Sequence, residues 1–274
     1  MMYPTYRDRY LPALTRAEID SLPAKETTPV ILPVGAVEQH GPHLPVGVDA
    51  LIGQARLDYA LPRLPKELPL WVAPAIQIGK SNEHTGFPGT LAISRTVLRR
   101  QLLAIAGQIR EWGFRCLLIL NTHGGNKQVI NYTIREIGDS LGMEVRKLQP
   151  SSNLEIDPQE AAYGFHAGAI ETNIMLEILD GRRVDLSHAT CEFPAWIDGE
   201  GLLRPESAPA IYSWVTSDIS NSGVMGNARA ASPEAGKAWF EAETESLVTA
   251  IHIERIEVLS GSGGTLYGSN AVNG

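Results

Sequence analysis

Residues 31–49 read ILPVGAVEQHGPHLPVGVD. The apolar run 31–37 predicts a buried strand, which a Gly-Pro pair directly after His40 brings to an end. Side chains in a strand alternate between its two faces, so Glu38 and His40 are expected to project from the same side. The strand thus leads into a turn and a short loop that are dense in side chains able to bind a metal or transfer a proton: Glu38, His40, His43 and Asp49.

Hydrophobic spacing on either side of this stretch predicts an alternation of strands and helices. Strands are expected at residues 30–37, 69–78, 115–120 and 143–148. Helices are expected at residues 15–22, 49–61, 94–112, 126–141, 171–179 and 232–253. Strands that alternate with helices form parallel sheets covered on both faces, so the predicted fold class is α/β with a mostly parallel central sheet.

The chain is expected to form one domain over residues 1–253. With 274 residues, of which 43% are hydrophobic, it can bury a core without disulfides. Residues 182–231, rich in Gly, Pro, Ser and Asp, are expected to form an irregular excursion that covers the substrate rather than a second domain. The glycine-rich residues 254–274 are expected to be a flexible C-terminal tail.

Charge and cysteine content exclude several classes of protein. The formal net charge is −8 and no basic stripe occurs, so neither nucleic acid nor an anionic membrane is an expected partner. No apolar run approaches the roughly 18 residues that a membrane helix needs, and the N-terminus lacks a signal-peptide core. The cysteines, Cys116 and Cys191, do not make a disulfide framework, which favours a cytoplasmic location.

Polar side chains from distant parts of the chain are expected to meet at one edge of the sheet. Glu38, His40 and His123 follow predicted strands, and the carboxyl ends of parallel strands form the edge at which α/β sheets bind ligands. His166 and Glu171 lie where a later helix begins. Histidines and carboxylates without cysteine are typical of zinc, manganese or iron(II) sites.

Formal charge favours two divalent metal ions in such a site. The carboxylates of Glu38, Asp49 and Glu171 contribute three negative charges, which two divalent cations and a bridging hydroxide would neutralise. A low-dielectric cleft disfavours a large net charge, and a single ion would leave the site anionic. For Glu171 alone, stabilisation by a helix dipole is a sufficient explanation, so the hypothesis depends on the whole set.

Four motifs, GAVEQHGPHLPVGVD, EHTGFPGT, NTHGGN and HAGAIET, occur in an order and spacing that resemble the creatininase (creatinine amidohydrolase) family. The resemblance covers about residues 28–250 and includes SWVTSDISNSGVMGN. It implies a three-layer α/β/α sandwich, a dinuclear metal centre, hydrolysis that is commonly of amide C–N bonds, and a homo-oligomer, often a hexamer.

The same resemblance implies roles for individual residues. Four residues match metal ligands by motif position: Glu38, His40, Asp49 as the bridge, and His123. His166 and Glu171 match the histidine and the acidic residue of the pattern H-A-G-x-x-E-T. Creatininase proper carries a ligand glutamate two residues after the NTHGGN-type histidine, where this chain has Gly125, so that role is assigned to Glu171. Many relatives also carry a glutamate at the position of Ala169.

The expected reaction is hydrolysis of a small polar cyclic amide or formamide, and creatinine itself is not the expected substrate because of Gly125. The metals would lower the pKa of a bound water and polarise the substrate carbonyl. His166 is expected to transfer a proton to the leaving group, and His123 is placed with it among the catalytic residues. His43 and His84 are expected either to support the metal ligands or to orient the small-molecule substrate, and Trp196 and Trp214 are expected to cover the substrate pocket.

Two other functions are consistent with the same residues. The first is cleavage of a C–C bond in an oxidised cyclitol or another cyclic diketone, which would use the same metals. The second is a metal-binding protein without turnover, although closed structural sites usually contain cysteine. The sequence does not separate C–N from C–C cleavage, nor does it identify the metal.

Overall fold

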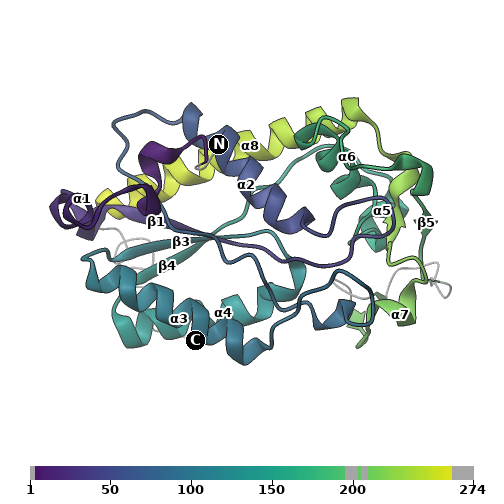
Figure 1. Cartoon of the computed structure of the whole chain (residues 1–274), viewed down its shortest axis with the longest axis horizontal. Coiled ribbons are helices and arrows are strands. Elements are labelled where there is room, and N and C mark those ends of the chain that lie inside the picture. The colour runs from purple at the N-terminus through teal and green to yellow at the C-terminus, as the bar shows by residue number, and fades with distance from the viewer. Residues whose placement is uncertain (1–3, 195–202, 205–208, 261–274) are drawn as a thin grey trace.

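A four-stranded parallel sheet lies at the centre of the molecule, with the strand order β2-β1-β3-β4 (Figure 1). The computed structural model describes residues 4–194, 203–204 and 209–260. The strands of the central sheet are β1 Pro29–Val34, β2 Trp71–Val72, β3 Cys116–Asn121 and β4 Glu144–Leu148. The α-helices are α1 Arg16–Ser21, α2 Val48–Ala60, α3 Arg95–Glu111, α4 Lys127–Leu141, α5 Pro158–Tyr163, α6 Ala169–Ile178, α7 Thr216–Ile219 and α8 Pro233–Ser260. The predicted α/β class is confirmed.

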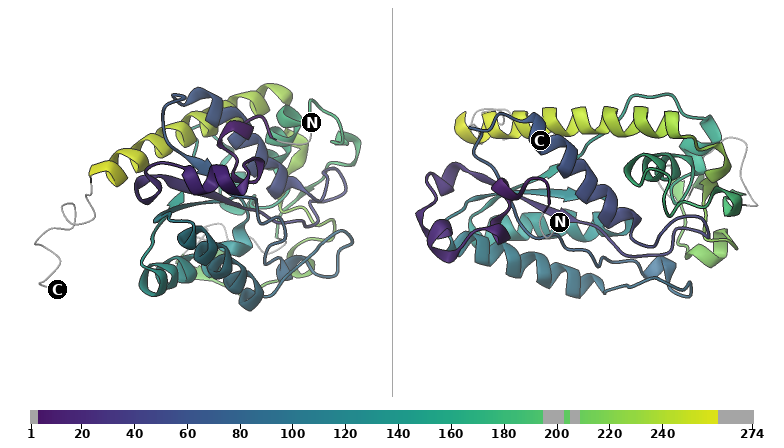
Figure 2. Two further views of the ribbon diagram at one scale, coloured as in Figure 1. Left: turned by 60° about the vertical axis from the view of Figure 1, so that its left-hand side comes forward. Right: turned by 45° about the horizontal axis from the view of Figure 1, so that its top comes forward.

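Helices cover both faces of the sheet and make the three layers expected from the resemblance. Figure 2 shows the same arrangement from two further sides, with α8 running along one face. Val30, Leu32 and Val34 of β1 belong to the apolar cluster under α3 and α4. Ile31, which points the other way, belongs to the cluster under α2 and α8. Because both faces are buried, β1 is apolar throughout instead of alternating with polar residues.

Helix starts follow the predicted capping residues. Thr15 forms a capping box with Glu18 at the start of α1. The Ser94 side chain accepts a hydrogen bond from the N–H of Val97 at the start of α3. These local signals explain why the predicted starts of both helices agree with the structure.

The first strand is shorter than predicted, and this changes how its polar side chains are held. β1 ends at Val34, so Glu38 and His40 lie on an extended loop and not on a strand face. The chain leaves the sheet because the Glu38 N–H donates to the carbonyl of Val46, in its own loop, instead of to a strand neighbour. Val37 forms only an isolated bridge with Leu91.

Three further boundaries differ from the predictions. β2 has two residues, whereas a strand over 69–78 was expected, because Pro74 has no N–H to donate to a neighbouring strand. Helix α5 lies within residues 150–165, which were expected to be a loop; Asp157 caps it and Pro158 is its first residue. Helix α8 continues to Ser260, past the predicted end at 253, so the described part of the predicted tail is helical.

The predicted excursion 182–231 is described only in part. Its short strands are β5 Cys191–Glu192, β6 Leu203–Arg204, β7 Ala210–Ile211 and β8 Gly226–Asn227. β5 pairs with β8, while residues 195–202 and 205–208 lie outside the described residues, as does the end of the tail, 261–274. The substrate-covering role of this region stays a prediction. Within the described ranges, no helix combines the length and apolar character needed to cross a membrane.

Candidate metal centre

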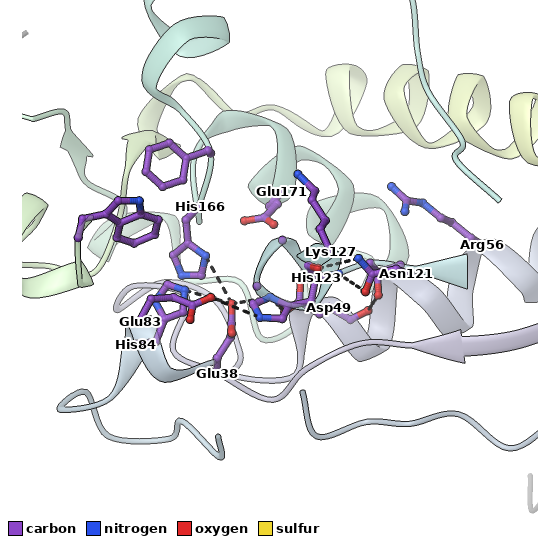
Figure 3. A pocket seen from close by; sticks show the side chains of 15 residues that line it. Glu38, Asp49, Arg56, Glu83, His84, Asn121, His123, Lys127, His166 and Glu171 are labelled. Carbon is purple, nitrogen blue, oxygen red and sulfur yellow. Dashed lines mark hydrogen bonds and ion pairs between the residues drawn. The ribbon is translucent and has the colours of Figure 1, made fainter. Parts of the chain in front are cut away.

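The candidate site lies at the carboxyl ends of β1 and β3 (Figure 3). In-register pairing places Val34 opposite Asn121, so the loops that follow the two strands begin side by side. The loop after β1 carries Glu38 and His40, and the loop after β3 carries His123. The polar residues therefore meet at the edge of the sheet where the sequence predicted a ligand site.

Asp49 reaches this edge because α2 begins against the end of β1. A Cβ atom on Gly35 would lie 3.1 Å from the backbone of Ala50, so the close approach of α2 favours glycine there. The Thr122 hydroxyl donates a hydrogen bond of 2.7 Å to the carbonyl of Asp49 and ties α2 to the loop after β3. Asp49 therefore lies in the first turn of α2, where the loop after β1 meets the start of the helix predicted from residue 49.

Glu38 is surrounded by histidines from three other segments. Its Oε1 atom lies 3.3 Å from His123 Nδ1 and 3.4 Å from His84 Nε2. The same oxygen lies 3.6 Å from His166 Nδ1. The His166 ring stacks on His84 with 4.0 Å between centroids, and it lies 4.3 Å from the ring of His40. This carboxylate is only 1% exposed, so the histidines and not water are its neighbours.

Asp49 lies between two groups of candidate ligands. Its Oδ2 atom is 3.4 Å from His123 Nδ1, and its Oδ1 atom is 4.0 Å from His40 Nε2. The His40 nitrogen is also 3.7 Å from Glu171 Oε2, an oxygen that accepts a 2.6 Å hydrogen bond from the N–H of Ala167. With His123 on one side and His40 and Glu171 on the other, Asp49 has the position that a bridging ligand would need.

Backbone carbonyls orient three histidines of the centre. The contacts are His40 Nδ1 to Glu38 O (3.1 Å), His123 Nε2 to Lys80 O (3.0 Å) and His166 Nε2 to Gln39 O (2.8 Å). A carbonyl can only accept, so each of these nitrogens carries a proton and the other ring nitrogen faces the carboxylates. Metal-binding histidines are held in this way.

Three buried atoms of the centre that could bind a metal have no hydrogen-bond partner among the described residues. They are Glu38 Oε2, His40 Nε2 and Asp49 Oδ2. Glu38, His40 and Asp49 also form one of three sets whose ligand atoms lie within 4.8 Å of one another. The other sets combine Glu38 with His84 and His166, and His40 with His166 and Glu171. Because a buried polar atom without a partner is costly and a cation would satisfy it, these residues fit a metal site.

The carboxylates of the centre differ in pKa, because burial and the neighbouring histidines shift their pKa values in opposite directions. Burial raises the pKa of Asp49 to about 6 and the pKa of Glu171 to about 7. Burial also raises the pKa of Glu38, but His123 and the other histidines outweigh it and lower this pKa to about 2. Glu38 is therefore the carboxylate that stays ionised, whereas Asp49 and Glu171 hold protons more readily in the absence of metal.

Two histidines of the centre, His84 and His166, are kept neutral. Burial lowers the pKa of His84 to about 4 and holds the pKa of His166 well below its ordinary value. His123 differs, because Asp49 and Glu38 outweigh its burial and raise its pKa well above the ordinary value. The two stacked rings can thus act as neutral imidazoles near pH 7, while His123 would have to lose a proton to bind a metal.

A cavity of about 270 Å³ opens onto these residues. His84 and Trp214, both predicted substrate-site residues, line this cavity. Phe165 also lines it, and its ring centroid is 5.3 Å from that of Trp214, so two aromatic side chains form part of the wall. Trp196, the remaining predicted aromatic contact, lies outside the described residues.

His43, predicted either to support the ligands from behind or to orient the substrate, lies away from the cavity. It is 2% exposed and is not among the described residues that line the cavity. Its Nε2 atom lies 2.9 Å from the Thr172 hydroxyl of α6, and burial lowers its pKa to about 4. His43 therefore connects the loop after β1 to α6 behind the site and does not face the cavity.

Glu83 is a site residue that sequence reasoning missed. A Cβ atom added to Gly125 would collide with the Glu83 carboxylate, which fills the space beside His123. Glu83 pairs with Lys80 Nζ at 2.7 Å and lies 3.7 Å from His123 Nε2. Its position directly before His84 was the one signal in the sequence. An acidic group is thus present next to His123 even though position 125 is glycine.

Two cations that line the cavity were also missed. Arg56 comes from α2 and Lys127 is the first residue of α4. Arg56 Nη2 donates a hydrogen bond of 2.6 Å to Glu243, and both side chains are about nine-tenths buried. Neither cation belongs to a motif, because only the packing of α2 and α4 around the sheet brings them together.

The geometry agrees with comparisons to known proteins. A family model described as "Creatininase: Creatinine amidohydrolase" matches residues 12–251. A mycofactocin precursor peptide peptidase of Mycobacterium tuberculosis (strain ATCC 25618 / H37Rv) is 31% identical over 230 residues, which cover 81% of this chain and 84% of that protein. A creatinine amidohydrolase of Pseudomonas putida is 28% identical over 266 residues, which cover 88% of this chain and 95% of that protein.

Solved structures agree with the fold as well. A creatininase variant described as the Zn-Zn type superposes with a TM-score of 0.68 and 25% identity, covering 92% of this chain and 98% of that one. The family that the motifs resemble and the fold that this resemblance implies are both confirmed. The chain is a hydrolase and belongs to the creatininase family.

Proposed function

We propose that this protein is a hydrolase that uses two divalent metal ions to cleave a C–N bond in a small polar amide. The main observation in favour of the proposal is that Glu38, His40 and Asp49 each have a buried oxygen or nitrogen atom that could bind a metal and that has no hydrogen-bond partner among the described residues. Glu38 and His123 would hold one ion, His40 and Glu171 the other, and Asp49 would bridge them. The solved relative of Zn-Zn type supports this number of ions and zinc as the first metal to test.

The bound metals would lower the pKa of a water molecule and polarise the substrate carbonyl. The protein would contribute orientation and proton transfer. His166 has its Nε2 proton fixed on the carbonyl of Gln39, so Nδ1 is the atom that can accept a proton and return it to the leaving amine. His84 stacks on this ring and fixes its plane, and Thr216 Oγ1 lies 2.7 Å from His84 Nδ1.

The size and lining of the cavity support a small substrate. About 270 Å³ is room for a small polar molecule, and the wall combines the aromatic rings of Phe165 and Trp214 with ionisable groups. Creatinine itself is proposed to be a poor substrate. The carboxylate of Glu83 fills the space at Gly125, so the acidic group beside His123 approaches from a different direction than a residue at position 125 would.

Cleavage of a peptide amide is a second candidate. The observation in its favour is the 31% identity to a peptide peptidase over most of both chains. Both candidates use the same metals and the same His166 and differ only in how much chain the substrate carries. C–C cleavage of a cyclic diketone uses these residues as well and stays an alternative. A metal-binding role without turnover fits less well, because the centre opens onto a cavity.

A substrate panel tests the proposal. Protein reconstituted with zinc, and with manganese in parallel, is incubated with creatinine, a small cyclic amide, an N-formyl amino acid, an oxidised cyclitol and a short peptide. C–N cleavage adds one water mass and releases a new amine, whereas C–C cleavage adds the water without a new amine. We expect amine release from a small amide and little from creatinine, with metal-free protein as the control.

Other outcomes of the panel discriminate between the candidates. Release of amines from the peptide alone would favour the second candidate. Creatinine turnover above about 10 s⁻¹, an ordinary enzyme rate, would overturn the substrate assignment and leave the metal site intact. A protein that holds two metal ions but turns over none of the compounds would count against the hydrolytic role of the site.

We also propose that the protein is a homo-oligomer, as the family resemblance implies. Light scattering at micromolar concentration measures the molar mass directly. A mass several times the 29.7 kDa of one chain is expected, and a mass near one chain would contradict the proposal.

A further inference from the structure

A second cavity of about 440 Å³ adjoins the cavity at the metal centre. The two share three lining residues, Arg56, Asn121 and Lys127. Figure 3 shows Lys127 and Asn121 between Glu171 and Arg56. The cleft therefore continues from the metal centre, past these shared side chains, into a second space that the proposed chemistry does not use.

The linings of the two cavities differ in charge, although Arg56 and Lys127 belong to both. The first is lined by four carboxylates: Glu38, Asp49, Glu83 and Glu171. Among the described residues that line the second, three are cations and none is acidic: Arg56, Lys127 and Lys147. In a chain whose formal net charge is −8, this group of cations is a local exception that favours a negatively charged ligand.

The cations come from three elements, and Lys147 and Arg56 have N–H groups left to donate to a ligand. Lys147 of β4 gives one hydrogen bond of 2.7 Å to Asn131 Oδ1, and an ammonium has three donors. Arg56 binds Glu243 through Nη2, while its buried Nε has no hydrogen-bond partner among the described residues. Lys127 begins a helix of 15 residues, whose N-terminal amides add partial positive charge.

The rest of the wall indicates what the anion is attached to. Asn131 and Gln149 add amide groups that can donate to an oxygen, and Ile130, Leu148 and Pro150 add apolar surface. In a ligand that has a carboxylate next to an apolar side chain, the carboxylate can bind the cations and amides while the side chain contacts the apolar residues. An inorganic anion would satisfy only the polar part.

We propose that the second cavity binds a carboxylate of the substrate while the amide to be cleaved lies at the metal centre. This rests on the proposed amide hydrolysis and narrows its substrate to an N-acyl amino acid or the carboxyl-terminal residue of a peptide. Water supplies a hydroxyl group to the acyl carbon and a hydrogen to the nitrogen as the C–N bond breaks. The released amino acid keeps its carboxylate among Arg56, Lys127 and Lys147.

The test compares N-acetyl-leucine with N-acetyl-leucinamide, which has the same shape without the negative charge. Calorimetry measures the binding of both to zinc-loaded and to metal-free protein. We expect the acid to bind at least about tenfold more tightly than the amide, and Lys147→Gln to remove most of this preference. Lys147 lies on an edge strand, where the change spares the core. Lys237→Gln, on the exposed side of α8, is the matched control and should keep the preference.

A third probe separates the two sources of the carboxylate. An N-acetylated tetrapeptide ending in leucine should bind more tightly than N-acetyl-leucine if the natural substrate is a peptide, and no more tightly if it is a small N-acyl amino acid. Equal binding of acid and amide, no binding of either, or no effect of Lys147→Gln would overturn the proposal. Metal content and turnover of neutral amides, measured on the same samples, show whether the proposed hydrolase function survives such a result.

Discussion

Leu118 in β3 and Asp49 in α2 are both almost fully buried, at 0% and 2% exposure, but their surroundings are opposite. Leu118 packs with Ile31 and Leu120 in the apolar cluster between the sheet and the helices α2 and α8. Asp49 lies among other ionisable groups, and its Oδ2 atom has no hydrogen-bond partner among the described residues. Burial of Leu118 stabilises the fold, whereas burial of Asp49 opposes it.

This difference distinguishes the apolar core, which stabilises the fold, from the carboxyl edge of the sheet, where the candidate metal site lies. The sheet and its helical layers position the loops after β1 and β3, and the carboxyl edge collects polar atoms that the protein alone leaves unsatisfied. Such atoms are tolerated where a bound ligand supplies the interaction that the protein does not.

The largest effect on turnover is expected from His166→Ala. Loss of a proton-transfer group should lower kcat about 10²- to 10⁴-fold, while zinc content and thermal stability stay close to those of the unchanged protein. Turnover of the substrate found in the panel and metal analysis measure both. His188→Ala, at an exposed histidine, is the control and should have little effect. A loss of less than about tenfold would remove His166 from proton transfer.

A stability comparison tests the contrast between core and edge directly. In metal-free protein, Leu118→Ala should lower the free energy of unfolding by about 2–5 kcal/mol, because it leaves a cavity in the core. Asp49→Asn should change it by less than about 1 kcal/mol or increase it, since a buried carboxylate is replaced by a neutral group of the same shape. Denaturant unfolding at pH 8 measures both. A large destabilisation by Asp49→Asn would show that this carboxylate supports the fold.

Zinc affinity should depend on pH. In metal-free protein, the pKa of Glu171 is about 7 and that of Asp49 about 6, so both carboxyls hold protons at pH 5.5. His123, whose pKa is also raised, must lose a proton as well. Because zinc has to displace these protons, affinity should be at least about tenfold higher at pH 7.5 than at pH 5.5. Glu171→Gln should make zinc affinity less dependent on pH. A zinc affinity of the unchanged protein that is the same at both pH values would contradict the prediction.

A smaller effect is expected from the aromatic wall of the first cavity. Trp214→Ala removes a ring that contacts Phe165 but leaves the candidate ligands in place. We expect KM to rise several-fold while zinc content stays unchanged, because a wall residue contributes to binding more than to the chemical step. A KM that does not change would exclude Trp214 from the substrate site.

Much of the fold could be predicted because local and tertiary signals agree. The apolar stretches that became β1, β3 and β4 alternate with helices whose ends carry their own signals, such as Thr15 and Ser94. The predictions fail where a tertiary contact sets the end of an element or where the element is too short to show a pattern. The loop contact between Glu38 and Val46 ends β1 early. Helix α5 has only six residues, too few to show a hydrophobic period.

The candidate site could be predicted where motifs follow strand ends. The structure brings Glu38, His40 and His123 together because parallel strands end at one edge. Glu83, Arg56 and Lys127 could not be found in this way. Their positions depend on the space over Gly125 and on how α2 and α4 pack, and neither has a signature within a single stretch of sequence.

The most direct test of the central claim is the number of metal ions per chain. Protein reconstituted with zinc, dialysed and analysed by inductively coupled plasma mass spectrometry should contain about two ions per chain. Asp49→Asn should lose at least one of them, whereas His43→Asn, behind the site, should keep both. One tightly held ion per chain, unchanged by Asp49→Asn, would contradict a centre in which two metals share that carboxylate.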